Sequence, residues 1–384
     1  MSRQEIIDKS KRIVIKLGTA VLMKDNGIAL SRFYSFVEGI AALMKSGKEV
    51  LLVTSGAVGL GSRTLGLAKP KLMPLKQACA AVGQGRLMSL YSDAFEKCDV
   101  IAAQVLLTEE DFSNRQRYLN LRSTIGELLA LSVLPIINEN DTVSTAELEL
   151  LQNPDVKVNF GDNDKLSALV ASKIDADLLL ILTDVEGLYS ADPRESDARL
   201  IPLVESFTPE IESLGETKAA SDKPGRGGIK TKLAAAKIAT QSGCAAIIAG
   251  GKQERVIDRL FAGEELGTLF MPHKGLSGKQ RWIAFATTVK AAIVINEGAR
   301  EALTRRKASL LPAGVVEVRG DFDRGDVVSI TTEAGKEFAR GIVNYAASEA
   351  RLVLGHHSED LEGLVSSKNY DALVTRDNIA FLDN

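Results

Sequence analysis

The sequence predicts an α/β protein whose mostly parallel sheet is covered by helices on both faces, followed by a smaller domain rich in strands. Short runs of Val, Ile and Leu recur through the first 250 residues, separated by helix-length segments rich in Ala, Leu, Lys and Glu. Runs that are apolar at nearly every position are typical of strands buried on both faces, and helical crossovers favour parallel pairing. The length of 384 residues, at about 150 per domain, predicts two domains.

The predicted strands of the first domain follow one another at helix-length intervals. They are Ile13–Leu17, Val50–Thr54, Val100–Leu107, Val133–Ile137, Leu178–Thr183 and Ala245–Ala249. Each run ends in small or polar residues. Ligands of open parallel sheets bind beyond the carboxyl ends of the strands, so functional residues are expected directly after these runs.

From about Val289 the pattern changes to shorter strand-like pieces broken by Pro, Gly and Asp. The pieces are Val315–Arg319, Asp326–Thr331, Gly341–Tyr345 and Ala372–Val374, preceded by one predicted helix at Asn296–Lys307. The segment Met271–Gln280, which contains Pro, Gly and Lys, is predicted as the linker. The predicted domains therefore cover residues 1–275 and 281–384, and the second is mostly β.

Composition limits the class of protein. The 45% hydrophobic and 25% charged residues are typical of a soluble globular chain, and 47 Lys+Arg against 50 Asp+Glu give no reason to expect nucleic acid or membrane as the main partner. Three unpaired cysteines argue against a disulfide framework or a zinc site. The N-terminus is polar and no apolar run reaches about 18 residues, so we expect a cytoplasmic protein with a small-molecule partner.

Two glycine-containing segments have the composition of phosphate sites. IKLGTA places Lys16 where a strand meets a glycine turn, and the N–H groups of Gly18 and Thr19 are expected to be free for an anion. KPGRGGIKTK leads into a helix starting near Thr231 and bearing Lys230 and Lys232. Alone, the first segment is more typical of a solvated turn, and the second is equally compatible with a surface loop.

VTSGAVGLG follows the second predicted strand and offers the Ser55 hydroxyl among three glycines. The spacings of the dinucleotide and GxxxxGK[ST] fingerprints are both missing. Tight packing of a strand on a helix explains the glycines as well as a ligand does. LTDVEGLY, with Thr183 and Asp184 at the end of a buried run, is likewise a strand followed by a turn.

Two clusters of acids and amides are more informative. Asn138-Glu139-Asn140-Asp141 follows one predicted strand, and Gly161-Asp162-Asn163-Asp164 precedes a helix starting near Lys165. Such clusters hold an ammonium group or position lysines and Mg²⁺. Asp164 also suits the N-cap of that helix, but capping explains only one of the carboxylates.

In order along the chain, IKLGTA, TSGAVGLG, INEND, GDND, LTDVEGLY and GRGGIKTK resemble the motifs of the amino-acid kinase family. The likeness covers about Lys11 to Phe270, and the C-terminal part resembles the PUA domain appended to many bacterial members. INEND together with GDND resembles the members that phosphorylate glutamate. The resemblance implies a three-layer α/β/α sandwich with a small PUA-like barrel. The implied reaction is ATP-dependent phosphorylation of the γ-carboxylate of L-glutamate, the first step of proline synthesis.

Carried over position by position, the resemblance makes Lys16 and Lys232 contacts of the transferring phosphoryl group, held in place by Asp164. It implies glutamate binding by Ser55, Asp141 and Asn163, with Asp162 close beside them. The implied nucleotide contacts are Lys16, Thr183, Asp184, Gly227, Gly228, Ile229, Lys230, Thr231 and Lys232. It also implies Mg²⁺ with ATP, proline as an inhibitor and a homodimer or homotetramer, while the metal ligands stay unassigned.

The chemistry agrees with the residue types present. A γ-carboxylate with a reference pKa of about 4.3 is already ionised at pH 7, so it needs no strong base to act as nucleophile. The protein has to align the reactants and offset phosphate charge, which lysines, Mg²⁺ and glycine-loop amides supply. A site without histidine or cysteine is therefore expected.

Two departures from the family pattern stand out. Arg226 lies in GRGGI where the family usually has GTGGM, and Thr142–Phe160 is longer than in many relatives. Two alternatives stay open: a related kinase acting on another acceptor such as N-acetylglutamate, and an RNA-binding regulatory protein. The second is disfavoured because residues 289–384 carry 12 Lys+Arg against 15 Asp+Glu, a net charge of −3.

Overall fold

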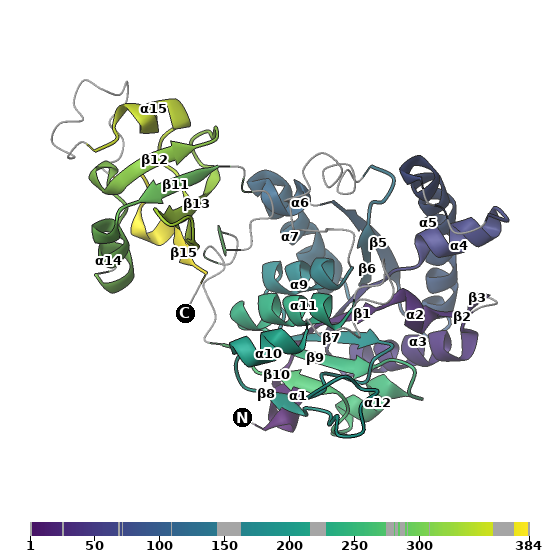
Figure 1. The fold of residues 1–384 in the computed structure, drawn as a ribbon. Coiled ribbons are helices and arrows are strands. Elements are labelled where there is room, and N and C mark those ends of the chain that lie inside the picture. The colour runs from purple at the N-terminus through teal and green to yellow at the C-terminus, as the bar shows by residue number, and fades with distance from the viewer. Residues whose placement is uncertain are drawn as a thin grey trace. The chain divides into compact units, whose positions relative to one another are not determined.

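The chain is made of two compact units, Met1–Gly275 and Leu276–Asn384. The structure is a computed structural model (Figure 1). It describes residues 2–24, 27–67, 70, 72–108, 110–143, 163–215, 228–273, 280, 283–284, 289, 291–306, 308–355 and 372–382.

An eight-stranded sheet runs through the first unit in the order β5-β6-β4-β1-β7-β9-β10-β8. The strands are β1 (Arg12–Leu17), β4 (Glu49–Val53), β5 (Ala102–Leu107), β6 (Leu134–Glu139), β7 (Leu178–Thr183), β8 (Leu203–Val204), β9 (Ala245–Gly250) and β10 (Thr268–Phe270). The six strands from β5 to β9 are parallel, whereas β10 is antiparallel to β9 and pairs in parallel with β8. The predicted mostly parallel sheet is thus confirmed. Met23–Lys24 (β2) and Gly27–Ile28 (β3) form a separate ribbon.

Helices cover both faces of this sheet (Figure 1). On one face, α1 (Arg3–Lys9), α3 (Leu30–Lys45), α5 (Met73–Glu96) and α12 (Val256–Phe261) share a core with Ile13, Ile15 and Leu17 of β1. On the other, α9 (Asn163–Lys173) packs against β1 and α11 (Ile229–Gln241), and α7 (Arg115–Ala130) packs against β6. Because successive side chains of a strand alternate between faces, Lys16 points toward the side of α9 and α11.

Local sequence explains where several helices begin. Asn114 at the start of α7 and Thr208 at the start of α10 (Pro209–Leu214) accept hydrogen bonds from backbone N–H groups three residues on. Such a cap stabilises a helix by about 1 kcal/mol. The other short helices of the first unit are α2 (Thr19–Leu22), α4 (Ala57–Thr64) and α6 (Glu110–Ser113).

Two glycines let α4 and α5 cross in backbone contact. A Cβ atom on Gly61 would lie 1.7 Å from the carbonyl oxygen of Cys79, and one on Gly83 would lie 1.8 Å from that of Ala57. No other residue type fits either position without moving a helix. This crossing fixes α5 relative to α4, and α4 begins two residues after Ser55, which follows β4.

The second unit contains a five-stranded sheet in the order β12-β11-β13-β14-β15. Its elements are β11 (Ala292–Ile295), α14 (Glu297–Arg305), β12 (Val315–Arg319), β13 (Val327–Thr332), β14 (Glu337–Ile342), α15 (Ala347–Leu352) and β15 (Ile379–Phe381), with single turns of 3-10 helix at Pro312–Gly314 and Arg376–Asn378. Among the strands that the structure describes here, β11 and β13 pair in parallel and the other neighbours are antiparallel. Its core includes Ile293, Val328, Ile330 and Phe338.

The prediction of a strand-rich second domain is confirmed, but details differ. Among the described residues the sheet is open, so the barrel closure implied by the resemblance is not observed there. The strand predicted at Gly341–Tyr345 begins earlier, at Glu337. The polar, partly exposed Glu337 and Arg340 interrupt its apolar pattern, although Phe338, Ala339 and Gly341 are buried. Ala372–Val374 contributes only a single bridge, from Val374 to Leu310.

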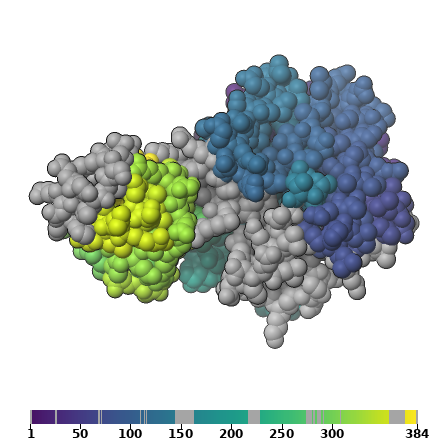
Figure 2. Space-filling view, turned by 90° about the horizontal axis from the view of Figure 1, so that it is seen from above, coloured from purple at the N-terminus to yellow at the C-terminus, as the bar shows by residue number. Residues whose placement is uncertain are grey.

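In the space-filling view, the blue atoms lie together on one face of the first unit (Figure 2). Every helix among the described residues falls short of the length and apolar character needed to cross a bilayer.

Candidate active site

Two lysines share one buried carboxylate at the carboxyl end of β1. Lys16 Nζ lies 2.6 Å from Asp164 Oδ1, and Lys232 Nζ lies 3.1 Å from Asp164 Oδ2. The three side chains are 7%, 5% and 1% exposed for Lys16, Lys232 and Asp164. The structure thus brings together three residues that lie far apart in the sequence.

Three elements deliver these side chains to one place. Lys16 is the second-last residue of β1, Asp164 is the second residue of α9, and Lys232 is the fourth residue of α11. The interpretation of Asp164 as an N-cap is therefore wrong, because the residue lies inside the first turn. Its carboxylate suits the positive end of α9, while both helix N-termini add positive potential to the site.

The cluster carries a net positive charge. Burial on its own would raise the pKa of Asp164. The ammonium groups of Lys16 and Lys232 and their hydrogen bonds lower it by more than burial raises it, so the pKa lies below its ordinary value. Asp164 stays ionised at neutral pH, and one carboxylate faces two lysines. A buried site with this charge favours an anionic ligand such as a phosphate group.

The first turn of α11 is tied to the same carboxylate. The Thr231 hydroxyl lies 3.0 Å from Asp164 Oδ2 and 3.0 Å from the carbonyl oxygen of Gly228. Gly228 is the N-cap and gives no side-chain cap. Ile229 is half-buried and Lys230 is exposed, whereas Gly227 and Arg226 lie outside the described residues.

Beside the lysines, Asn163 joins the ends of two strands. Its Nδ2 donates to the carbonyl oxygen of Thr54, after β4, at 2.7 Å, and to Oδ1 of Asn138, in β6, at 3.1 Å. Its own Oδ1 is buried and has no hydrogen-bond partner among the described residues. A buried acceptor without a partner is costly, so this oxygen marks a place for a donor group of a ligand.

Ser55 links β4 to β1. Its hydroxyl donates to the carbonyl oxygen of Leu17 at 2.9 Å and accepts from the Thr19 hydroxyl at 3.2 Å. The expectation that the Gly18 N–H is free for an anion is wrong, because it donates to the carbonyl oxygen of Leu182 in β7 at 3.2 Å. This bond extends the pairing of the two central strands by one residue.

The other predicted residues lie at neighbouring strand ends. Thr183 is buried at the end of β7 and its hydroxyl donates to the exposed Asp184 at 3.2 Å. Asp141 is half-buried in the turn after β6. Asp162 and most of Thr142–Phe160 lie outside the described residues.

Sequence reasoning did not assign individual roles to three residues of the site. Asn138 belonged to an acid–amide cluster but was not singled out, and Thr54 contributes through its backbone carbonyl, which carries no residue-type signal. Gln84, from the middle of α5, accepts from Asn138 Nδ2 at 2.8 Å. Nothing in its local sequence marks it.

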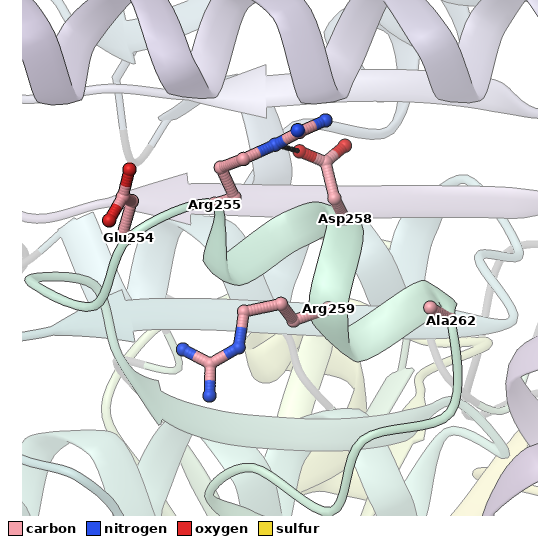
Figure 3. A pocket seen from close by; sticks show the side chains of 5 residues that line it. All are labelled: Glu254, Arg255, Asp258, Arg259 and Ala262. Carbon is pink, nitrogen blue, oxygen red and sulfur yellow. Dashed lines mark hydrogen bonds and ion pairs between the residues drawn. The ribbon is translucent and has the colours of Figure 1, made fainter.

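A pocket elsewhere on the first unit lacks comparable chemistry. It is lined by Glu254, Arg255, Asp258, Arg259 and Ala262, around α12 (Figure 3). Arg255 pairs with Asp258 at 2.9 Å and Arg259 pairs with Glu264. Because α12 packs on the face of the sheet opposite α9 and α11, this pocket is separate from the lysine cluster.

The described residues of the site offer little to hold a metal ion. The part of the chain that the structure describes contains no group of three or more His, Cys, Asp or Glu residues able to hold a metal ion. The carboxylate at the centre of the site is already shared by two lysines. A divalent cation there would depend mainly on oxygens of the ligand, which is the usual situation for Mg²⁺ with phosphates.

Comparison with known proteins identifies the family. The model of the amino acid kinase family matches residues 11–250, and that of the PUA domain matches residues 291–365. A protein of Citrifermentans bemidjiense named glutamate 5-kinase is 45% identical over 99% of this chain and 100% of its own length. Proteins of the same name from Caldanaerobacter subterraneus and Methanosarcina barkeri are 44% and 45% identical, over 97% and 100% of this chain and 98% and 99% of theirs.

Among solved structures, carbamate kinase from Giardia lamblia bound to AMP-PNP is 18% identical and covers 69% of this chain and 99% of its own, with a TM-score of 0.49. UMP kinase from Bacillus anthracis is 15% identical over 70% of this chain and 98% of its own, with a TM-score of 0.44.

The amino acid kinase model matches most of the chain, and the relatives named glutamate 5-kinase are 44–45% identical over nearly its whole length. The chain therefore belongs to the amino acid kinase family and, within it, to the glutamate 5-kinases.

Proposed function

We propose that this chain transfers the γ-phosphoryl group of ATP to the γ-carboxylate of L-glutamate, giving L-glutamyl 5-phosphate. The observation that carries the proposal is the buried cluster of Lys16, Asp164 and Lys232, which holds two ammonium groups at the carboxyl ends of the central strands. The name shared by relatives that are 44–45% identical over nearly the whole chain supports the choice of substrate.

In this proposal the two lysines contact the phosphoryl group in transit. Phosphoryl transfer depends on alignment and on offsetting the charge of the phosphate oxygens. Asp164, ionised because its pKa is lowered, holds the two ammonium groups apart by binding each with a different oxygen. The γ-carboxylate of glutamate is ionised at pH 7 and attacks without a general base.

On the glutamate side, Asn163 Oδ1 accepts a hydrogen bond from the α-ammonium group, which fills its empty acceptor position. Ser55 and Asp141, with Asp162 beside them, complete the proposed amino-acid site. On the nucleotide side we assign Thr183, Asp184 and the segment Gly227–Lys232. The dipole of α11 and the N–H groups of its first turn favour the ATP phosphates there.

Mg²⁺ is proposed to enter with ATP, bound mainly by phosphate oxygens and water, and it supplies further positive charge to the triphosphate. Its absence should abolish turnover without unfolding the protein. A cytoplasmic location is proposed from the sequence composition, and inhibition by proline and a homodimeric or homotetrameric state are proposed from the family resemblance.

The decisive experiment measures ATP consumption by the purified protein with Mg²⁺ and each of four acceptors: L-glutamate, N-acetyl-L-glutamate, L-aspartate and UMP. Hydroxylamine traps an acyl phosphate as its hydroxamate. We expect hydroxamate with L-glutamate alone, and less of it when proline is added. Turnover with a different acceptor would replace the substrate, and no turnover with any acceptor would contradict the kinase proposal.

A further inference from the structure

A chain of three side-chain amides runs from α5 to the proposed glutamate site. Gln84 Oε1 accepts from Asn138 Nδ2 at 2.8 Å, and Asn138 Oδ1 accepts from Asn163 Nδ2 at 3.1 Å. Asn138 is 2% exposed and Gln84 is half-buried. The chain ends at Asn163 Oδ1, the buried acceptor without a partner among the described residues.

The carbonyl oxygen of Thr54 sets the polarity of this chain at one end. The carbonyl oxygen of Thr54 can only accept, so Asn163 must present its NH₂ group to Thr54 and to Asn138. Asn138 must then turn its oxygen toward Asn163 and its NH₂ group toward Gln84. If Gln84 offers no acceptor, Asn138 loses one of the two hydrogen bonds that keep this orientation. A flipped Asn138 amide would then set NH₂ against NH₂ at Asn163.

The position of Gln84 is fixed by the helix that carries it. Gly83, the residue before it, touches the backbone of α4 at Ala57, and a Cβ atom there would lie 1.8 Å from the Ala57 carbonyl oxygen. Seven residues on, and so on the same face of α5, the Tyr91 hydroxyl forms a 2.9 Å hydrogen bond with the side chain of Thr54. The helix therefore contacts both residues that hold Asn163: Thr54 through Tyr91, and Asn138 through Gln84.

We infer that Gln84 is a positioning residue for the acceptor substrate: through Asn138 it orients Asn163 so that Asn163 Oδ1 faces the ammonium group of the bound amino acid. This inference rests on the proposed function and deepens it. Gln84 is not assigned any contact with the substrate. Its effect belongs to the binding of glutamate and not to the binding of ATP or to the chemical step.

The test is steady-state kinetics of the full-length protein with Gln84→Met, which keeps the length of the side chain and removes the acceptor. We expect the KM for L-glutamate to rise about tenfold, because an unsatisfied buried amide donor weakens a site by about one power of ten. The KM for ATP should stay within about twofold. Gln84→Glu keeps an acceptor oxygen and should restore most of the lost affinity.

Two controls separate positioning from a general loss of structure. Gln116→Met makes the same substitution at an exposed position of α7, where Gln116 Nε2 donates to Asn120 Oδ1 at 3.0 Å, and should leave both KM values unchanged. In an Asn163→Ala background, Gln84→Met should add no more than about a twofold change, because its route to the substrate is gone. Gln84→Ala, which also removes the acceptor and suits a helix, is measured in parallel and replaces Gln84→Met if that variant does not fold.

An unchanged glutamate KM in both acceptor-lacking variants would overturn the inference. Equal rises in the KM values for glutamate and ATP, or a full tenfold effect in the Asn163→Ala background, would overturn it as well. Failure of the proposed function is recognised separately, since it removes glutamate turnover from the wild-type protein itself.

Discussion

At the scale of single residues, Asp164 decides the character of the site. It is 1% exposed and bound by two lysines and a threonine. One ionised carboxylate leaves the cluster with an excess positive charge while keeping both lysines in fixed positions. The Asp164 side chain thus stabilises two buried cations and leaves one positive charge for the proposed phosphate ligand.

The role of Lys232 is tested by Lys232→Met, which keeps much of the aliphatic stem and removes the charge. We expect kcat to fall about 10²- to 10³-fold, the range found when one group stabilising transition-state charge is removed. The KM for glutamate should change little. Lys237→Met, on the same helix but half-exposed and paired with Glu212 at the surface, is the matched control and should keep wild-type kcat.

The charge of Asp164 should also be visible in stability. Asp164→Asn leaves two buried lysines without a counter-charge, and we expect it to lower the free energy of unfolding at pH 7 by about 3 kcal/mol. The measurement is urea unfolding. Asp99→Asn, at an exposed position with positive φ that suits asparagine, should be neutral.

The pH dependence of that difference has a definite sign. Because the folded-state pKa of Asp164 is lowered, its contribution is complete above the unfolded-state pKa of about 4 and is lost as the pH falls toward the folded value. The gap between wild type and Asp164→Asn should therefore narrow from pH 6 toward pH 3. A gap that widens on acidification would contradict the assignment.

At the scale of elements, the crossing of α4 and α5 depends on two glycines. Gly61→Ala would force a Cβ atom to 1.7 Å from a backbone oxygen that cannot move alone, so one helix has to shift. We expect the free energy of unfolding to drop by about 3 kcal/mol, at the upper end of the range for overpacked sites. Differential scanning calorimetry is the direct measurement.

Gly59→Ala, in the same helix, is expected to act in the opposite direction. A Cβ atom on Gly59 meets nothing within 4 Å, and the residue is exposed. Alanine is favoured over glycine in a helix by up to about 1 kcal/mol, so this variant should be slightly more stable than wild type. Equal effects of the two variants would mean that the crossing is not rigid.

The length of a strand decides whether the sequence reveals it. Continuous apolar runs predicted Leu178–Thr183 with the bounds that β7 has, because burial on both faces leaves an unambiguous pattern. The two- and three-residue strands β8 and β10 are too short to carry a pattern, and their antiparallel direction was not predicted.

The candidate site also contains residues that the sequence pattern reveals and residues that it does not. Lysines, acids and amides after strands drew attention to Lys16, Asn163 and Asp164, but only the resemblance to a family gave them roles. Gln84 and the carbonyl of Thr54 could not be found by pattern, since one is an ordinary helix residue and the other acts through its backbone. Their importance comes from three-dimensional contacts alone.

At the scale of the whole molecule, every candidate site residue lies in the first unit, Met1–Gly275, which has its own sheet and core. A protein ending at Gly275 should therefore fold and keep turnover within a few-fold of the full chain. Circular dichroism melting and the hydroxamate assay together test this. A truncated protein that melts cooperatively but has no activity would show that the second unit contributes to catalysis.

The central position of β1 in the sheet has a consequence for folding during synthesis. β1 is made first, yet its two partners are β4, which follows soon, and β7, which begins only at Leu178. At about 5–20 residues per second, the roughly 160 residues between them take about 8–30 s to leave the ribosome. During that time one edge of β1 is open, and Lys16 has neither Asp164 nor Lys232 beside it until α9 and then α11 have been translated. The nascent chain is therefore without the proposed phosphate site until nearly the whole first unit has emerged.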